Sequence, residues 1–455
     1  QKINIDSKYN KFKYKINGWR YKKVRSYSLV KKIGKLWCAI AVVTSANFVY
    51  AAEEAGVTRY VRFTDNMETH SGILEGDSIR VLDGDPVFED GVSPTGRTVE
   101  LSDVVLEIPM NPARVPNVMG VAGNSNNPNG SPVTVNHPRW FGKANTSLAK
   151  NGAPVEVPFG ATNFNFEGEL GLIIGREGRH IPESEAMDYL FGVTVGNDWS
   201  ENDWCGERRG IEEPTHVFCK AGDTFATLGD AVVTGLDLGD LQITVRLDGV
   251  VAAQGTSADF RDTPARLISK ISHYVTLKRG DIIFTGTVAP PQLPGTRRQL
   301  WQDDVVEVEI ENIGTVSNQL VRVTRETVSG PEISAANGTY VRFERAGGTS
   351  FGIMNGEEIS ELDGDPVGGN ASLSGRTFDV SDVELGLPID PAKPGRKVLA
   401  AAANYQPTSA PPRQMPHPRY LFKRSTALSA DGGDVERPQE VEMFIPEGEL
   451  VIVIG

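Results

Sequence analysis

Short apolar runs alternate with turn residues along most of the chain. The runs are rich in Val and Ile, and Gly, Pro, Asp and Asn separate them, as in GDSIRVLDGDP, QITVRLDGVVAAQG, GDIIFTGT and DDVVEVEIENIGTVSNQLVRV. β-Branched residues are enriched in strands, and these turn residues interrupt strands. The pattern therefore predicts a mainly β fold with few helices, in the α+β class.

Two segments show a helical pattern instead. Residues 183–191, ESEAMDYLF, form the clearer one. Residues 263–275, TPARLISKISHYV, place apolar residues at 267, 268, 271 and 275 on one side, after a Thr-Pro start that is typical of a helix N-terminus. We expect a helix in each segment.

A repeat of long period changes the expected domain organisation. Four landmarks recur with small changes 280 positions later: RYVRF at 59–63, LDGDP at 82–86, HPRWFGK at 137–143 and EGEL at 167–170. A period of this length indicates a duplicated domain rather than a solenoid unit. We expect three parts: a first copy at 57–330, a linker at 331–337, and a truncated second copy at 338–455.

The stretch FNFEGELGLIIG at 164–175 sets two carboxylates into an apolar run. On a strand, Glu167 and Glu169 point to the same face, about 7 Å apart along the axis. Like charges on one face repel, and an unpaired carboxylate in a buried strand is costly. A divalent cation would resolve both problems, because hard ions take carboxylate oxygens. The alternative is a strand end with two solvated glutamates.

Charge is distributed unevenly over the 455 residues. The formal net charge is −13, but residues 1–51 contain twelve Lys or Arg and one acid, so the rest of the chain carries −24. An acidic body argues against a nucleic-acid partner and suits a protein that recruits cations. The length allows two or more domains with substantial cores.

The basic segment ends in the apolar run LWCAIAVVTSANFVYAA. The run is too short and too polar for a membrane-spanning helix, so we expect no membrane span. A basic region, an apolar region and Val49-Tyr50-Ala51 resemble a secretory signal peptide, which predicts a periplasmic or secreted protein. The alternative is a basic tail on a cytoplasmic protein. Of the three cysteines, Cys38 would be removed with the signal peptide. Cys205 and Cys219 would remain in the mature protein, and their spacing indicates neither a metal site nor a disulfide framework.

Five segments occur in an order that resembles the fumarylacetoacetate hydrolase family: FEGELGLIIG, GVTVGNDWSENDW, CKAGDTFATLGDAVVT, LDGVVAAQGTSADF and LISKISHYVTLKRGDIIFTGT. The resemblance covers about residues 110–315. It implies a mixed β-roll, with one complete copy and the first part of a second, usually in a homodimer. It also implies Mg²⁺, Ca²⁺ or Mn²⁺ held by Glu167, Glu169 and Asp198.

The resemblance carries over to three further positions. Lys220 matches a lysine that faces the substrate, and we expect it to be catalytic. Lys143 and Thr287 match substrate-contacting residues. Each has a structural alternative: Lys220 could be a surface lysine beside Asp223, Lys143 could equally be structural, and Thr287 could be a turn residue after a buried strand.

The chain also departs from the family pattern. Hydrolytic members carry an Asn-Tyr-x-x-His-x-x-Glu segment, whereas residues 123–132 read GNSNNPNGSP and residues 403–412 read ANYQPTSAPP. The water-activating His and Glu are therefore missing. His137 and His216 are expected to be packing or turn residues. Two candidate bases remain: a metal-bound hydroxide, and Lys220 if burial lowers its pKa.

The leading hypothesis is thus a divalent-metal-dependent enzyme acting on small 1,3-dicarbonyl or 2-oxo acids. Family reactions are carbon–carbon hydrolysis, decarboxylation and isomerisation. Decarboxylation and isomerisation need an ion that stabilises an enolate more than they need an activated water. The alternative is a non-catalytic domain that binds the cation and an oxo acid but has lost turnover.

Overall fold

The computed structural model describes residues 56–125, 139–205, 216–288, 299–324, 338–345, 347–368, 371–391, 393, 398–402, 419–423, 427–430 and 451. The expected signal segment at 1–51, most of segment 123–132, segment 403–412 and the second EGEL at 447–450 lie outside the described residues, as does His137. Predictions that concern them stay predictions. Within the described part, no helix has the length and apolar character needed to cross a bilayer.

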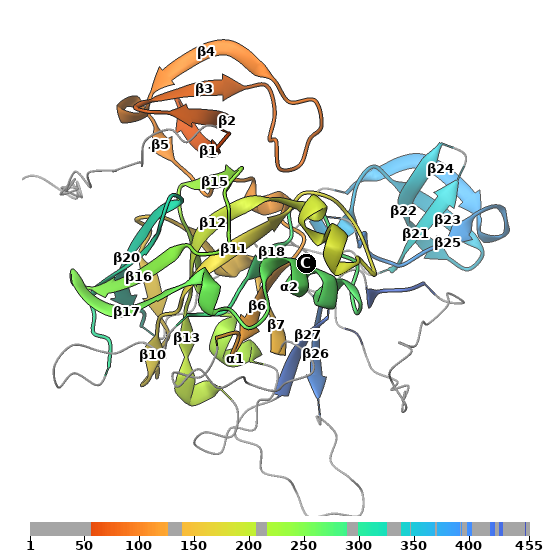
Figure 1. Ribbon diagram of the computed structural model, residues 1–455. Coiled ribbons are helices and arrows are strands. Elements are labelled where there is room, and N and C mark those ends of the chain that lie inside the picture. Colours follow the sequence, from red (N-terminus) through yellow and green to blue (C-terminus); the bar gives the residue numbers. More distant parts are fainter. Residues whose placement is uncertain are drawn as a thin grey trace, which may run out of the picture. The chain divides into compact units, whose positions relative to one another are not determined.

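A large mixed sheet carries the candidate site of the first copy (Figure 1). Its strands follow the order β4 (Pro94–Glu100), β3 (Ser78–Leu82), β2 (Glu68–Glu75), β1 (Thr58–Asp65), β15 (Ala231–Thr234), β12 (Leu190–Asp198), β11 (Gly168–Ile174), β18 (Ile282–Phe284), β6 (Val118–Ala122) and β7 (Arg139–Lys143). Off this path lie β5 (Val105–Leu106), β8 (Leu148–Lys150) and β14 (Ala226–Leu228). Most pairs are antiparallel, but β18 with β6 and β14 with β8 are parallel.

A second sheet packs on the first through a shared apolar core. Its order is β17 (Val250–Thr256), β16 (Gln242–Leu247), β19 (Val305–Ile310), β20 (Gly314–Arg322) and β9 (Val155–Val157), and the short strands β10 (Phe164–Asn165) and β13 (Ser200–Glu201) pair separately. Strand β11 is buried along its whole length. At Gly168 a Cβ atom would lie 2.4 Å from Val245 and 2.9 Å from Val308, so the residue between the two glutamates must be small.

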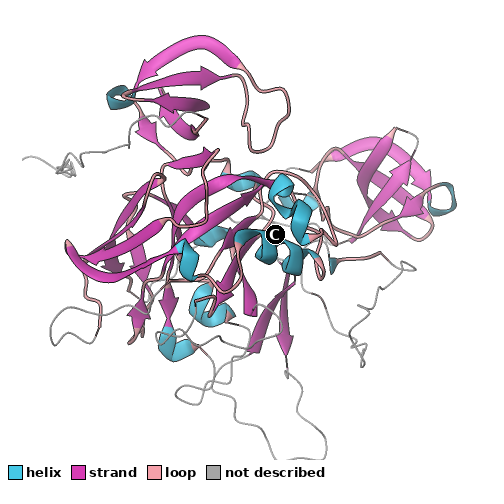
Figure 2. Ribbon diagram, in the orientation of Figure 1, coloured by secondary structure: helices cyan, strands magenta, loops and turns pink. Residues whose placement is uncertain are grey.

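The helices confirm one expectation and modify the other (Figure 2). Helix α2 (Pro264–Ser272) begins as predicted, with the Thr263 side chain accepting from Arg266 N, and it buries Leu267, Ile268 and Ile271. Residues Glu183–Tyr189 form a 3₁₀ helix, and the next two residues belong to β12. Its only buried residue is Ala186, so packing does not enforce a longer α-helix.

The remaining helical segments are short. Helix α1 (Val217–Lys220) is a single turn that the sequence pattern did not predict, and it carries a candidate site residue at its end. The other 3₁₀ turns described are Leu101–Asp103, Pro112–Arg114, Asn145–Ser147, Asn202–Trp204, Ser257–Asp259, Pro366–Gly368 and Val380–Asp382. The mainly β fold with few helices is therefore confirmed.

The second copy repeats the N-terminal strands of the first. Its sheet has the order β24 (Leu373–Asp379), β23 (Glu358–Leu362), β22 (Gly348–Asn355), β21 (Thr339–Arg345) and β25 (Glu384–Leu385); β26 (Val398–Ala402) and β27 (Arg419–Lys423) form a separate pair. Tyr60 pairs with Ile73 in the first copy, and Tyr340 pairs with Ile353 in the second. The period of 280 seen in the sequence is thus also the period of strand register.

Candidate metal centre and active site

Three carboxylates meet where β11 begins and β12 ends. The two strands are antiparallel, with Gly168 opposite Asn197, so the start of one lies beside the end of the other. Asp198 N donates to Glu167 O over 2.9 Å. One carboxylate oxygen from each of Glu167, Glu169 and Asp198 lies within 4.8 Å of the other two. The structure therefore brings together the three residues that the resemblance implied.

The surroundings of Glu169 suit a cation. Its side chain is buried, and burial followed by repulsion from Asp198 and Glu167 raises its pKa well above the ordinary value. Its Oε2 accepts from Gly286 N over 2.7 Å, whereas Oε1 has no hydrogen-bond partner among the described residues. An orphaned buried oxygen beside two further carboxylates is a donor set that fits a hard divalent cation such as Mg²⁺, Ca²⁺ or Mn²⁺.

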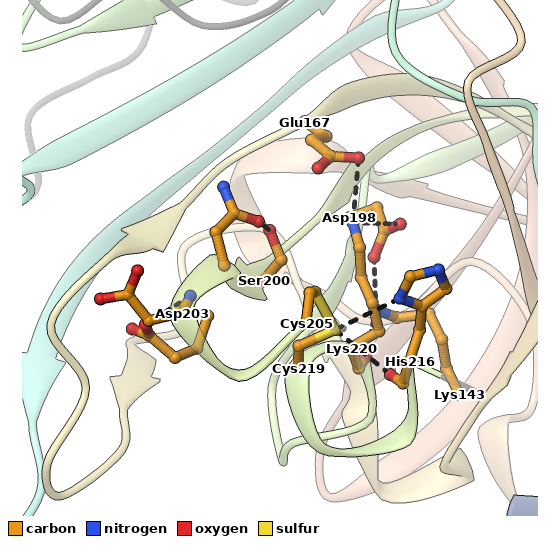
Figure 3. The surroundings of a disulfide bond; sticks show 11 residues. Lys143, Glu167, Asp198, Ser200, Asp203, Cys205, His216, Cys219 and Lys220 are labelled. Atoms are coloured by element: carbon orange, nitrogen blue, oxygen red, sulfur yellow. Dashed lines mark hydrogen bonds and ion pairs between the residues drawn. A yellow bond between two sulfur atoms is a disulfide. The ribbon is translucent and has the colours of Figure 1, made fainter. Parts of the chain in front are cut away.

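Lys220 lies against the same carboxylates (Figure 3). Its Nζ is 2.9 Å from Asp198 Oδ2 and 2.9 Å from Glu167 Oε2, and its side chain is almost fully buried. Burial alone would lower the pKa of Lys220, but Asp198, Glu167 and Glu169 outweigh it and raise the pKa above its ordinary value. The three nearby carboxylates favour the ammonium form, which argues against the lowered pKa considered from the sequence.

Lys143 lies buried beside Asp198, and its expected contact with substrate stays a prediction. Its side chain is fully buried, and Nζ donates to Asp198 Oδ1 and to the Lys220 carbonyl. Burial lowers the pKa of Lys143, and Asp198 opposes that shift. This geometry fits the structural alternative for Lys143, because its ammonium group contacts the candidate metal ligand Asp198 from the buried side.

Thr287 lies in the turn after β18, and the turn reaches the site. Gly286 has φ of +95°, which favours glycine, and its N–H is the donor to Glu169. Thr287 itself is half-buried. Its proposed contact with substrate stays a prediction.

A disulfide closes the loop beside the lysines (Figure 3). Cys205 and Cys219 are bonded, which corrects the expectation that these cysteines form no disulfide framework. His216 begins α1 with φ of 59°, and its Nδ1 lies 3.8 Å from Cys219 Sγ. Its ring also meets Phe141 edge-on, with ring centroids 5.6 Å apart, as expected of a packing histidine. One sequence feature could have suggested this disulfide. Cys205 and Cys219 lie next to or within two segments that resemble the family, and the resemblance places both segments at the site.

Comparison with known proteins gives the family. The model for the C-terminal domain of fumarylacetoacetate (FAA) hydrolase matches residues 110–321, and the model described as Rv2993c-like, N-terminal, matches residues 58–109 and again 339–388. The two matches to one N-terminal model agree with the duplication seen in the strands. The chain belongs to the fumarylacetoacetate hydrolase family.

Individual relatives extend this result. Protein Rv2993c of Mycobacterium tuberculosis is 33% identical over 244 residues, which cover 52% of this chain and 84% of that protein. The mitochondrial oxaloacetate tautomerase fahd2 of Xenopus laevis is 33% identical over 190 residues, which cover 40% of this chain and 58% of the tautomerase. The crystal structure of 5-carboxymethyl-2-hydroxymuconate delta-isomerase from Mycobacterium smegmatis matches with a TM-score of 0.52 and 28% identity, covering 58% of this chain and all of that one.

Proposed function

We propose that the protein is a divalent-metal-dependent enzyme that tautomerises or isomerises small 2-oxo or 1,3-dicarbonyl acids. The observation that carries the proposal is the cluster of Glu167, Glu169 and Asp198, in which the buried Oε1 of Glu169 has no hydrogen-bond partner in the described part of the chain. The Lys220 ammonium lies beside this cluster. Relatives whose names include oxaloacetate tautomerase and delta-isomerase support this reaction class. The tautomerase match spans less than two thirds of that relative, so the activity itself belongs to the proposal.

The chemistry follows from what the residues can hold. Glu167, Glu169 and Asp198 would bind the cation, which when bound supplies positive charge that stabilises the enolate form of an oxo acid. The Lys220 ammonium adds a second positive charge and a proton donor at the same place. Lys143 keeps Asp198 in position from the buried side. Tautomerisation removes a proton from carbon and adds one to oxygen without consuming water, so it does not require the water-activating His and Glu that residues 123–132 lack.

The test is turnover with matched variants. Purified protein is assayed with Mg²⁺ or Mn²⁺ against oxaloacetate, acylpyruvates and other oxo-diacids, following keto–enol conversion, decarboxylation and cleavage separately. We expect keto–enol conversion that Glu169→Gln abolishes and that Glu177→Gln, at an exposed carboxylate, leaves unchanged. Tight oxo-acid binding without turnover would favour the non-catalytic alternative, and cleavage as the dominant reaction would contradict the proposed reaction class.

The assembly and location belong to the same proposal. A homodimer is implied by the family resemblance. A periplasmic or secreted location follows from the signal-like segment, and the Cys205–Cys219 disulfide supports it, because disulfides persist in oxidising compartments. Sedimentation of the purified protein and fractionation of the cells that make it test these two points.

A further inference from the structure

Asn124 is a buried amide between two segments that are distant in sequence. It follows β6, is fully buried, and donates through Nδ2 to Asp262 O over 3.0 Å and to Thr285 O over 2.7 Å. Its Oδ1 accepts from Asp262 N over 2.8 Å. All the hydrogen-bonding groups of this side chain are therefore directed at backbone atoms, which is the role of an amide that fixes chain geometry.

One of those bonds reaches the metal centre through a single peptide unit. The carbonyl of Thr285 accepts from Asn124, and the N–H of the next residue, Gly286, donates to Glu169 Oε2 over 2.7 Å. The carbonyl and the N–H are opposite ends of one planar group. A change in the direction of the Thr285 carbonyl therefore also redirects the donor to Glu169.

Packing at Gly286 makes this peptide dependent on Asn124. A Cβ at Gly286 would lie 2.8 Å from Asn124 Cβ and 2.9 Å from Val121 O, so the residue must remain glycine. Glycine leaves the backbone free to rotate, and rotation of the peptide would turn the Thr285 carbonyl toward the Glu169 carboxylate. The Asn124 donor opposes this rotation.

We propose that Asn124 is a positioning residue for the metal centre. By holding the Thr285–Gly286 peptide, it keeps Oε2 of Glu169 occupied by a backbone N–H. Oε1, which has no hydrogen-bond partner among the residues that the structure describes, is left to the cation. This inference rests on the proposed metal centre. Asn124 belongs to residues 123–132, the segment that lacks the family's His and Glu, and the proposal gives this residue a role.

The experiment measures Mn²⁺ affinity rather than activity. Asn124→Asp keeps the size of the side chain and the acceptor for Asp262 N, but removes both donors. We expect its Mn²⁺ dissociation constant, read from the electron paramagnetic resonance signal of free Mn²⁺, to rise about tenfold or more, as for other residues that orient metal ligands. Asn318→Asp is the matched control, because Asn318 is also buried and its Nδ2 donates to the carbonyls of Lys150 and Ala153.

The outcomes separate this inference from the metal proposal. Asn318→Asp should lower thermal stability but keep the Mn²⁺ dissociation constant within about twofold, because its peptide partners do not reach a metal ligand. If Asn124→Asp does not fold, Asn124→Ser is measured in the same way. A folded Asn124 variant with wild-type Mn²⁺ affinity, while Glu169→Gln has lost it, overturns the positioning role. Unchanged Mn²⁺ affinity in Glu169→Gln overturns the metal centre itself.

Discussion

Lys220 Nζ lies 2.9 Å from Asp198 Oδ2, although the two residues belong to different elements on either side of a disulfide-closed loop. Asp198 ends β12, and Lys220 ends α1. The same ammonium reaches Glu167 on the neighbouring side. The ammonium groups of Lys220 and Lys143 therefore balance part of the negative charge of the three carboxylates, and a divalent ion would offset the rest. This arrangement makes the site sensitive to metal and to the loss of either lysine.

Metal binding is expected to stabilise the protein. Adding Mg²⁺ or Mn²⁺ to EDTA-treated protein should raise the melting temperature, because a ligand at about 100 times its dissociation constant contributes about 2.7 kcal/mol. Differential scanning calorimetry measures the shift. Glu169→Gln should show no shift at millimolar metal, since it removes a ligand from the cluster. A shift of wild-type size in this variant would place the bound ion elsewhere.

Lys220 is expected to be needed for turnover. On the substrate found in the panel, Lys220→Met at saturating Mn²⁺ should lower kcat about a hundredfold or more, the usual scale for a group that donates or accepts a proton in the transition state. Lys220→Arg keeps the charge and should retain part of the activity. His216→Gln serves as the control, because His216 packs on Phe141 and should be dispensable. A dead His216→Gln with an active Lys220→Met would reverse these roles.

Lys143 is expected to contribute to stability rather than to substrate affinity. Lys143→Met leaves Asp198 without one of its two ammonium partners in a buried place, and removing one partner of such a pair costs about 3–5 kcal/mol. Urea unfolding of the metal-free protein measures the loss. The KM of the folded variant should stay close to that of wild type. A large rise in KM without a loss of stability would restore the substrate-contacting role that the resemblance implied.

Asp230 is expected to make stability depend on pH. Burial raises its pKa to about 6 from an ordinary 3.8, against the Asn151 hydrogen bond and Lys150. The folded state therefore holds this proton more tightly than the unfolded chain. The resulting stabilisation is present below pH 3.8 and is lost as pH rises through about 6.

Asp230→Asn removes this dependence, because the amide stays neutral. We expect the variant to be more stable than wild type at pH 7.5, by on the order of 3 kcal/mol, and similar to wild type near pH 4. Urea unfolding at the two pH values checks this. Asp188→Asn, at an exposed position, should show no such difference. A variant that is less stable than wild type at both values would contradict the assignment.

The disulfide between Cys205 and Cys219 is expected to stabilise the folded protein. The two cysteines are 14 positions apart, and closing a loop of about 15 residues contributes about 3 kcal/mol in the chain-entropy description. The double variant Cys205→Ser/Cys219→Ser should melt at a lower temperature than wild type and should be insensitive to a dithiol. Wild type that melts identically with and without a dithiol would show that the bond does not contribute.

Much of the fold could be read from local patterns. Helix α2 begins where Thr263 and Pro264 predict, because capping depends on neighbouring residues only. The helix expected at 183–191 is instead a 3₁₀ helix that ends at Tyr189, and the last two residues of the segment belong to β12. The competition between helix and strand at these residues depends on strand pairing, which local propensity does not contain. The second copy was predicted from repetition, and its strands keep the same register.

Local sequence patterns suffice for the alternation that builds the sheets, for the duplication, and for the spacing of Glu167 and Glu169 at the start of a buried strand. These three features depend only on the spacing of residues along the chain. Local patterns do not predict that the Lys143 ammonium contacts Asp198, that three carboxylates surround Lys220, or that Asn124 donates to the Thr285 carbonyl. The physical reason is that burial and electrostatic balance are set by neighbours from distant segments, and only folding brings those segments together.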